Sequence, residues 1–315
     1  MKLIIQVPCY DEESTLPETL ADLPREVEGF TKVEWLVVDD GSRDGTSEVA
    51  RNHGVDHVVR LNHNHGLAHA FMTGLRRGIE LGADVIVNTD ADNQYRSKDL
   101  PNLVRPILDG EADIVVGARS IETIEHFSAV KRILQRLGSR VVRTLSRTEI
   151  QDAPSGFRAI SRDAALRLNV FTRYTYTLET IIQAGLCDLR VVNVPVGVHP
   201  PTRPSRLIRS VGSYVWRSLQ TMLSVYLIYK PIRLFGFLAF LFLTPGFLLA
   251  VRYLYFAWIG EGKGHVQSVI VGGALVVCGI FMLAVATLAH LQAINRRLLE
   301  ELRYQERKRS GGPSS

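Results

Sequence analysis

Residues 85–95, Val-Ile-Val-Asn-Thr-Asp-Ala-Asp-Asn-Gln-Tyr, are the stretch on which the interpretation of this chain depends. The apolar residues 85–87 predict a buried strand. Asp90, Asp92 and Gln94 follow at alternate positions, and alternate side chains of an extended segment point to the same side. Hard oxygen ligands just beyond a strand's carboxyl end suit Mg²⁺ or Mn²⁺ bound together with substrate phosphates. The spacing alone fits an Asp-rich turn equally well, so the neighbouring segments have to decide.

The composition limits the class of protein without naming one. The 315 residues are enough for one large domain or two modest ones. Hydrophobic residues make up 46% of the chain and are concentrated near its C-terminus. The net charge of +5 fits anionic lipids, phosphate substrates and nucleic acid alike. Cys9, Cys187 and Cys278 show no metal or redox spacing, so free thiols in a reducing compartment are expected, and no signal peptide is recognised at the N-terminus.

The first 120 residues alternate between strand and helix patterns. Strands are predicted at 3–7, 33–38, 55–61, 85–87 and 112–117, with helices from about residue 14 and at 47–53, 64–81 and 98–109. This alternation predicts an α/β fold with a mostly parallel sheet and helices on both faces. Polar residues follow four of the strands, at 8–12, 39–42, 90–92 and 117–119. Because these ends meet at one rim of a parallel sheet, they favour a binding site over an idle turn. Nicotinamide-type and P-loop glycine motifs are absent from the sequence.

Three runs in this order resemble glycosyltransferase family 2. They are Val-Pro-Cys-Tyr-Asp-Glu at 7–12, Val-Val-Asp-Asp-Gly-Ser-Arg-Asp-Gly-Thr at 37–46 and Asp-Ala-Asp-Asn-Gln at 90–94. Within the family, the chain is similar to the dolichyl-phosphate mannose synthase branch of polyprenyl-phosphate glycosyltransferases, over roughly residues 1–210. The resemblance implies a GT-A type, Rossmann-like fold and a nucleotide-sugar donor.

The resemblance also implies roles for individual residues. The residues implied to bind the nucleotide are Pro8, Tyr10, Glu12, Asp39, Asp40, Asp90 and Ala91. Those implied to hold the metal and diphosphate are Asp90, Asp92 and Gln94, with Arg119 facing a phosphate. A D-x-x-S-G-F block at 152–157, a turn that feeds a strand, implies that Asp152, Ser155 and Arg158 face the reaction centre. Glu179 stands where the family has a helix carboxylate, although an acid on an apolar helix can equally be paired in a core.

Two basic segments are candidates for the lipid end of the site. Residues 121–147 form a basic amphipathic pattern, which fits a membrane-surface helix or an ordinary surface helix. In the Pro-rich loop near 200–206, Arg203, Ser205 and Arg206 can bind diphosphate or lipid phosphate. The family usually has Ser-Lys at the place of Ser205-Arg206, a more distant preceding arginine, and prolines where this chain has Arg96-Ser97.

The last third of the chain has the composition of a membrane segment. Residues 207–231 predict an interfacial amphipathic helix, and 232–294 a hairpin of two spans. The uncharged cores of these spans, 234–251 and 266–289, are 18 and 24 residues long, which is enough to cross a bilayer. Two buried core helices are the competing interpretation. The basic tail at 295–315 places both termini and the domain at 1–206 in the cytoplasm, as in a multi-pass protein of the inner membrane.

Together with the resemblance, these features predict a Mg²⁺- or Mn²⁺-dependent transfer of a sugar from a UDP- or GDP-hexose to an undecaprenyl- or dolichyl-type phosphate. The resemblance implies that the transfer inverts the anomeric carbon. The residues expected to act in catalysis are Asp92, Arg119, Ser155, Arg158, Arg203 and Arg206, with Ser155, Ser205 and Arg206 on the acceptor phosphate. No nucleic-acid partner is expected, and pairing into a homo-oligomer stays open. A processive polysaccharide synthase is disfavoured because no Q-x-x-R-W motif follows Glu179. A catalytically silent scaffold that binds nucleotide-sugar is disfavoured by the intact acidic motif at 90–94.

Overall fold

The computed structural model of the chain describes residues 1–119, 143, 148–170, 176–199, 216, 219–220, 223–224, 226–227 and 231–310. These residues divide into two compact units. The first, here called the sheet unit, comprises Met1–Leu223 together with Arg303–Ser315. The second, the hairpin unit, comprises Ser224–Leu302. Of the predicted basic helix at 121–147 only residue 143 is described. Of the predicted interfacial helix at 207–231 the described residues are 216, 219–220, 223–224, 226–227 and 231, and they are helical.

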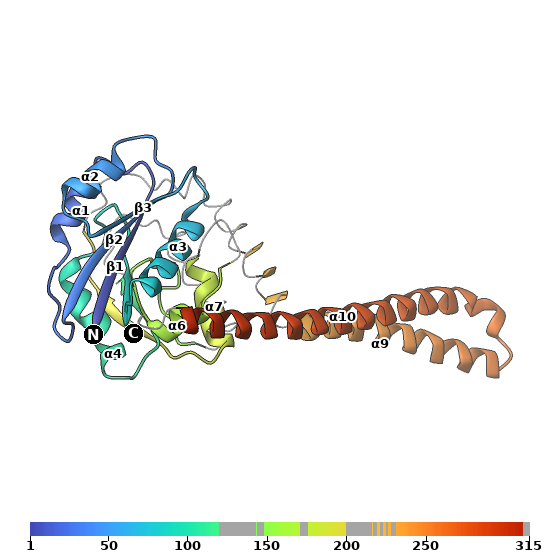
Figure 1. Cartoon of the computed structure of the whole chain (residues 1–315). Coiled ribbons are helices and arrows are strands. Elements are labelled where there is room, and N and C mark those ends of the chain that lie inside the picture. Colours follow the sequence, from blue (N-terminus) through green and yellow to red (C-terminus); the bar gives the residue numbers. More distant parts are fainter. Residues whose placement is uncertain are drawn as a thin grey trace. The chain divides into compact units, whose positions relative to one another are not determined.

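A seven-stranded sheet forms the centre of the sheet unit (Figure 1). Its strands in chain order are β1 (Lys2–Cys9), β2 (Lys32–Asp39), β3 (His57–Arg60), β4 (Val85–Asn88), β5 (Ile114–Arg119), β6 (Arg158–Ser161) and β7 (Val191–Val196). In space they are arranged β3-β2-β1-β4-β6-β5-β7. All neighbours are parallel except β6, which runs antiparallel to β4 and β5. The predicted mostly parallel sheet is therefore confirmed, with one reversed strand in it.

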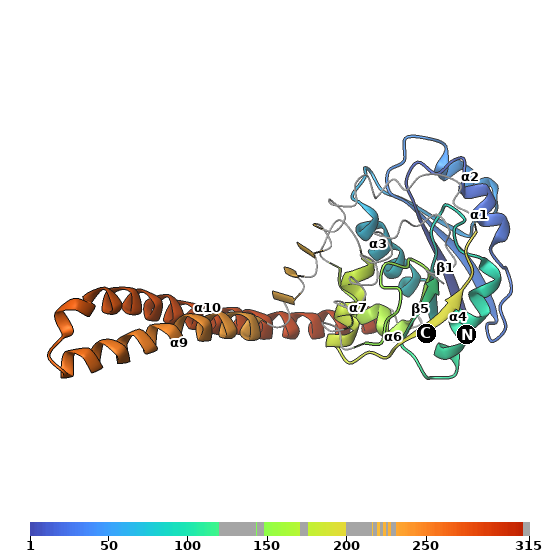
Figure 2. The same cartoon turned by 180° about the vertical axis from the view of Figure 1, so that it is seen from behind.

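Helices cover both faces of this sheet, as the alternating pattern predicts (Figures 1 and 2). One face carries α1 (Leu16–Asp22), α2 (Thr46–Asn52) and α4 (Leu100–Leu108), which follows the short η1 (Ser97–Asp99). The other face carries α3 (Leu67–Glu80), α6 (Arg162–Arg167) and α7 (Thr177–Leu186). The packing of α3 on the sheet is close at Gly78, where an added Cβ would lie 2.7 Å from Ile86 Cδ1.

The antiparallel direction of β6 decides what gathers at the rim where the parallel strands end. Parallel strands present their last residues there, including Cys9, Asp39 and Asn88. A reversed strand presents its first residue instead, and Arg158 accordingly pairs with Asn88 in β4 and with Val116 in β5. The loop at 152–157, which precedes β6, is thereby brought to the same rim as the ends of β1, β2 and β4.

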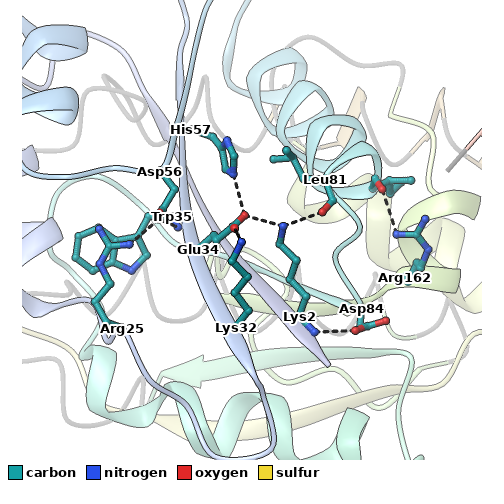
Figure 3. A network of polar contacts seen from close by, with 11 residues as sticks. Lys2, Arg25, Lys32, Glu34, Trp35, Asp56, His57, Leu81, Asp84 and Arg162 are labelled. Carbon is teal, nitrogen blue, oxygen red and sulfur yellow. Dashed lines mark hydrogen bonds and ion pairs between the residues drawn. The ribbon is translucent and has the colours of Figure 1, made fainter. Parts of the chain in front are cut away.

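The opposite end of the sheet is fastened by a polar network around Glu34 (Figure 3). The Glu34 carboxylate, 8% exposed, lies 2.7 Å from Lys2 Nζ, 2.5 Å from Lys32 Nζ and 2.8 Å from His57 Nε2. Burial alone would raise the pKa of Glu34, but hydrogen bonds from these three residues outweigh it and lower the pKa to about 2. The network ties β1, β2 and β3 together where they begin.

The hairpin unit contains the two apolar helices that the sequence predicts, the second of them as far as Leu302. They are α9 (Pro231–Trp258) and α10 (Val266–Ser310), joined through η2 (Gly262–His265). Gly246 and Gly272 allow close approach, since a Cβ at Gly246 would lie 3.0 Å from the Gly272 carbonyl oxygen. Both helices are long and apolar enough to cross a membrane, and only 11% and 17% of their most apolar windows are buried. The predicted tail at 295–315 is helical as far as Ser310, as a continuation of α10.

Candidate active site

The loop that follows β1 donates backbone N–H groups to side-chain hydroxyls of the segment that follows β2. The Asp11 N–H donates to Ser42 Oγ at 2.9 Å, and the Glu12 N–H donates to Thr46 Oγ1 at 2.9 Å. Asp11 has a φ of 52°, which turns the chain immediately after β1. Of the predicted nucleotide contacts in this loop, Pro8 and Glu12 are buried and Tyr10 is partly exposed.

The predicted nucleotide residues Asp39 and Asp40 are buried and hold the surrounding loops. Asp39 accepts a hydrogen bond from the Ser42 N–H at 2.8 Å and another from the Ser47 hydroxyl. Asp40 accepts from the N–H groups of His65 at 2.9 Å and Gly66 at 2.8 Å. These contacts fix the two loops that border the rim at β2. The sequence shows both acids at a strand end but gives no sign of these partners, which lie up to 26 residues further along the chain.

The acidic stretch at 90–94 is a turn, which is one of the two alternatives that its spacing left open, and it is not the extended segment of the other alternative. Asn93 has a φ of 53°, and the Gln94 N–H donates back to Asp92 Oδ1 at 3.2 Å. Asx-type bonds of this kind favour a turn over extended backbone. Gln94 does not share a direction with the two carboxylates by alternation, and its Oε1 accepts from Arg119 Nη1 at 3.4 Å. The Ala91 carbonyl accepts from Thr19 Oγ1 at 2.9 Å, which anchors the turn to α1.

Asp90 lies directly against the backbone of the loop at 152–157. A Cβ at Gly156 would lie 2.7 Å from Asp90 Oδ1 and 2.8 Å from Oδ2, so any larger residue here would displace the Asp90 carboxylate or the loop. Burial, followed by the negative charge of Asp92, raises the pKa of Asp90 to about 7, although Arg119 and Arg158 act in the opposite direction.

Arg119 is held at the end of β5 by a bidentate pair with Asp152. Arg119 Nε donates to Asp152 Oδ2 at 2.7 Å, and Nη2 donates to Oδ1 at 3.0 Å. Asp152 is fully buried, and its Oδ2 accepts a third hydrogen bond, from the Arg119 backbone N–H, at 3.2 Å. The pair directs the remaining guanidinium nitrogen, Nη1, toward Gln94. Asp152 thus orients a cation beside the acidic turn.

Arg158, which was expected to face the reaction centre, is buried beneath the loop at 152–157. Only 1% of it is exposed, and its guanidinium donates to Ser155 O at 2.8 Å, Ala153 O at 2.7 Å and Thr180 Oγ1 at 2.6 Å. Ser155 is fully buried as well. Glu179, one residue before Thr180 on α7, is 1% exposed. Arg158 and Ser155 therefore lie beneath the loop at 152–157 and form a buried layer, here called the supporting layer, while Glu179 is buried on α7.

Two tyrosines and an asparagine complete this layer and were not expected from the sequence. The Gly156 N–H donates to the Tyr95 hydroxyl at 3.0 Å. Asn88 Nδ2 donates to Gly156 O and to the Tyr176 hydroxyl, both at 2.9 Å. Tyr95 directly follows the acidic stretch, which is a usable signal, whereas Tyr176 is 88 residues from Asn88 and has no local signature.

The segment that leaves β7 is fastened to the acidic turn. The His199 N–H donates to Gln94 O at 2.8 Å, and the Arg96 N–H donates to Gly197 O at 3.3 Å. The Gly197 N–H donates to Asp99 Oδ2 at 2.7 Å. Residues 200–206 lie outside the described part of the chain, and with them the predicted phosphate contacts Arg203, Ser205 and Arg206.

Comparisons with known proteins agree with this architecture. The family model described as "Glycosyl transferase family 2" matches residues 4–168, more than half of the chain. An undecaprenyl-phosphate mannosyltransferase of Micrococcus luteus is 29% identical over 206 residues, which is 62% of this chain and 83% of that protein. A UDP-N-acetylglucosamine–dolichyl-phosphate N-acetylglucosaminyltransferase of Methanococcus voltae is 27% identical over 60% of this chain and 82% of its own length.

A solved structure with the same fold is that of glucosyl-3-phosphoglycerate synthase from Mycobacterium tuberculosis in complex with Mn²⁺, UDP and glucosyl-3-phosphoglycerate. It is 22% identical, with a TM-score of 0.55 over 71% of this chain and 79% of that one. This likeness confirms the GT-A fold that the motifs predict. The family model matches residues 4–168, and the motifs of the family lie in order at the ends of β1, β2 and β4. The chain therefore belongs to glycosyl transferase family 2.

Proposed function

We propose that this protein transfers a sugar from a nucleotide-sugar to a polyprenyl phosphate at the membrane surface. The products are a polyprenyl-phosphate sugar, inverted at the anomeric carbon, and a nucleoside diphosphate. Two relatives named for undecaprenyl-phosphate and dolichyl-phosphate acceptors support this acceptor class. A UDP- or GDP-hexose is the proposed donor.

The observation that carries the proposal is the attachment of residues 197–199 to the acidic turn. The His199 N–H bonds to Gln94 O at 2.8 Å, so the basic loop begins beside the proposed metal ligands. Arg203 follows four residues later, and four extended residues span at most about 14 Å. Arg203, Ser205 and Arg206 therefore belong to a segment whose start is fixed within reach of the turn, which suits binding of a lipid phosphate there.

At the donor side, Asp90, Asp92 and Gln94 are the residues proposed to hold Mg²⁺ or Mn²⁺. The donor set consists of carboxylate and amide oxygens, which these hard cations prefer. Among the described residues, no group of three or more His, Cys, Asp and Glu side chains is arranged to hold a metal. Mg²⁺ commonly takes only one or two carboxylates from a protein and completes its coordination with substrate phosphates and water. The bound metal would supply positive charge to the departing diphosphate.

Arg119 is the second positive charge proposed to act on the leaving group. Its pairing with Asp152 fixes the guanidinium plane, and its Nη1 lies 3.4 Å from Gln94 Oε1. A preorganised cation needs no reorganisation as negative charge develops on the diphosphate. Arg158 and Ser155, which are buried, serve by holding the loop against Asp90.

The acceptor chemistry explains why the site can work without a strong general base. A phosphate monoester loses its second proton with a pKa of about 6, so the acceptor is already an anionic nucleophile at pH 7. The protein has to place that oxygen in line with the anomeric carbon. Two candidate spans, α9 and α10, would keep the sheet unit at the surface where such a lipid phosphate lies, with both termini in the cytoplasm.

A donor panel on purified full-length protein tests the proposal. UDP- and GDP-sugars are combined with a short-chain polyprenyl phosphate and Mg²⁺, Mn²⁺ or EDTA, and lipid-linked product is measured by mass spectrometry. We expect metal-dependent product with one donor class, and a loss of at least about 100-fold for Asp92→Ala. Asp109→Ala is the matched control, because Asp109 pairs with Arg105 at an exposed helix end. Full metal-dependent transfer by Asp92→Ala would show that the metal site is wrongly assigned, and no product with any donor would reject the function.

A further inference from the structure

The C-terminal end of α10 is packed into the sheet unit, against α6. Residues from Arg303 onward belong to the same compact unit as the sheet. Only 7% of Tyr304 is exposed, and its hydroxyl donates to Asp163 Oδ1 at 2.5 Å. The guanidinium carbon of Arg167 lies 4.3 Å from the centre of the Tyr304 ring. A tyrosine buried between an acid and an arginine of one short helix makes a specific contact with that helix.

Arg307, one turn further along α10, binds the carboxyl end of the same helix. Its Nη1 donates to Leu166 O at 3.1 Å and Leu168 O at 3.3 Å, and its Nη2 donates to Asn169 Oδ1 at 3.0 Å. The last carbonyl groups of a helix lack partners inside the helix, and a cation there also complements the helix dipole. Arg307 therefore caps α6 from outside.

The residues capped by Arg307 lead directly to the supporting layer of the site. The Asn169 N–H donates to Gln183 Oε1 on α7 at 3.0 Å. One turn earlier on α7, Thr180 accepts from Arg158, which holds the carbonyls of Ala153 and Ser155. The end of α10 therefore contacts α6, the loop that positions Asp90 contacts α7 through Arg158, and Asn169 joins the segment after α6 to α7.

We propose that Tyr304 and Arg307 are positioning residues that fasten the end of α10 to α6 and, through Asn169 and α7, set the loop at 152–157. The helix that forms the second candidate span, α10, would then also stabilise the loop at 152–157. The predicted effect on sugar transfer rests on the proposed function, whereas the docking of α10 on α6 does not.

Amide hydrogen exchange on full-length protein in detergent tests the docking without any substrate. Tyr304→Phe and Arg307→Gln are compared singly and together with wild type and with Arg309→Gln, an exposed arginine two residues beyond Arg307. We expect exchange in residues 162–186 to become at least tenfold faster in the double variant and to stay unchanged in Arg309→Gln. If exchange in α6 and α7 is the same in the double variant and wild type, the docking is refuted.

Kinetics then test whether the docking positions the loop. We expect kcat to fall about three- to tenfold in Arg307→Gln while the Kd for the nucleoside diphosphate is unchanged, because Asp39 and Asp40 are held by other loops. Asp163→Asn combined with Tyr304→Phe should be no worse than either single variant if the two residues act through their shared hydrogen bond. Unchanged kcat despite faster exchange refutes the positioning role. Wild-type protein that makes no product rejects the proposed function, and exchange alone then decides on the docking.

Discussion

Replacing Gly156 with alanine tests whether the place of the Asp90 carboxylate matters for activity. The added methyl carbon would lie 2.7 and 2.8 Å from the two carboxylate oxygens and 3.0 Å from the Tyr176 hydroxyl. Ordinary contact begins at 3.4 Å, so Asp90 has to retreat by 3.4 − 2.7 = 0.7 Å or the loop has to move as far. Gly156 does not have a positive φ, so alanine brings no backbone strain of its own.

The size of the effect follows from this displacement. Catalytic groups need to be held within about 0.5 Å, and a misplacement of about 1 Å costs about 100-fold in rate. A shift near 0.7 Å should therefore lower kcat/KM about 10- to 100-fold, which is about 1.4–2.7 kcal/mol of transition-state stabilisation. Overpacking should also lower the free energy of unfolding by about 1–3 kcal/mol.

A matched variant separates the two effects. Gly78→Ala introduces the same methyl group at the same distance, 2.7 Å, from Ile86 Cδ1 in β4, but on the α3 side and away from the acidic turn. Both variants are compared with wild type in the lipid-product assay and in thermal unfolding in detergent. We expect similar losses of stability but a loss of kcat/KM in Gly156→Ala alone. Wild-type activity in Gly156→Ala, or an equal loss in both variants, would refute the reasoning.

Three further substitutions probe the supporting contacts. Glu34→Gln should lower the free energy of unfolding at pH 7 by about 3 kcal/mol, because the pKa of Glu34 in the folded protein, about 2, lies below the ordinary 4.5. In unfolding titrations, the difference in stability between wild type and variant should shrink as the pH falls from 4.5 toward 2. Asp152→Asn removes the charge partner of the buried Arg119 guanidinium and should lower the free energy of unfolding by about 3 kcal/mol. The control Asp113→Asn breaks the exposed pair with Arg190 next to β5 and should lower it by at most about 1 kcal/mol. Equal losses in chemical unfolding would contradict this expectation. Tyr95→Phe leaves the buried Gly156 N–H without its acceptor and should lower the melting temperature by an amount equivalent to about 1–3 kcal/mol, so an unchanged melting temperature would speak against the contact.

The parts of the fold that the sequence predicts correctly are those encoded locally. The strands β1, β2, β4 and β5 are apolar runs that end in polar residues, and each was expected within two residues of its observed bounds. The direction of β6 was not predicted, because a strand of four residues carries no signal of which way it runs between its neighbours. The turn at 90–94 was one of two alternatives that the spacing left open, because alternation assumes extended backbone, whereas Asn93 is one of the few non-glycine residues that adopt a positive φ readily.

The sequence could not predict which motif residues are buried and bonded to neighbouring loops, because that depends on contacts between segments far apart in the chain. A buried guanidinium has five N–H donors, and each of them needs an acceptor. For Arg158, three acceptors are the carbonyl oxygens of Ala153 and Ser155 and the hydroxyl of Thr180. Those bonds join it to the loop and to α7, whereas its place directly after the D-x-x-S-G-F block had implied that it faces the reaction centre. The same argument applies to Asp40, whose two oxygens accept backbone N–H groups 25 and 26 residues away. If such residues act by holding loops, their replacement should alter the loops' exchange rates before it alters nucleotide affinity. Arg119 should behave differently, because its pairing with Asp152 leaves Nη1 directed at the acidic turn.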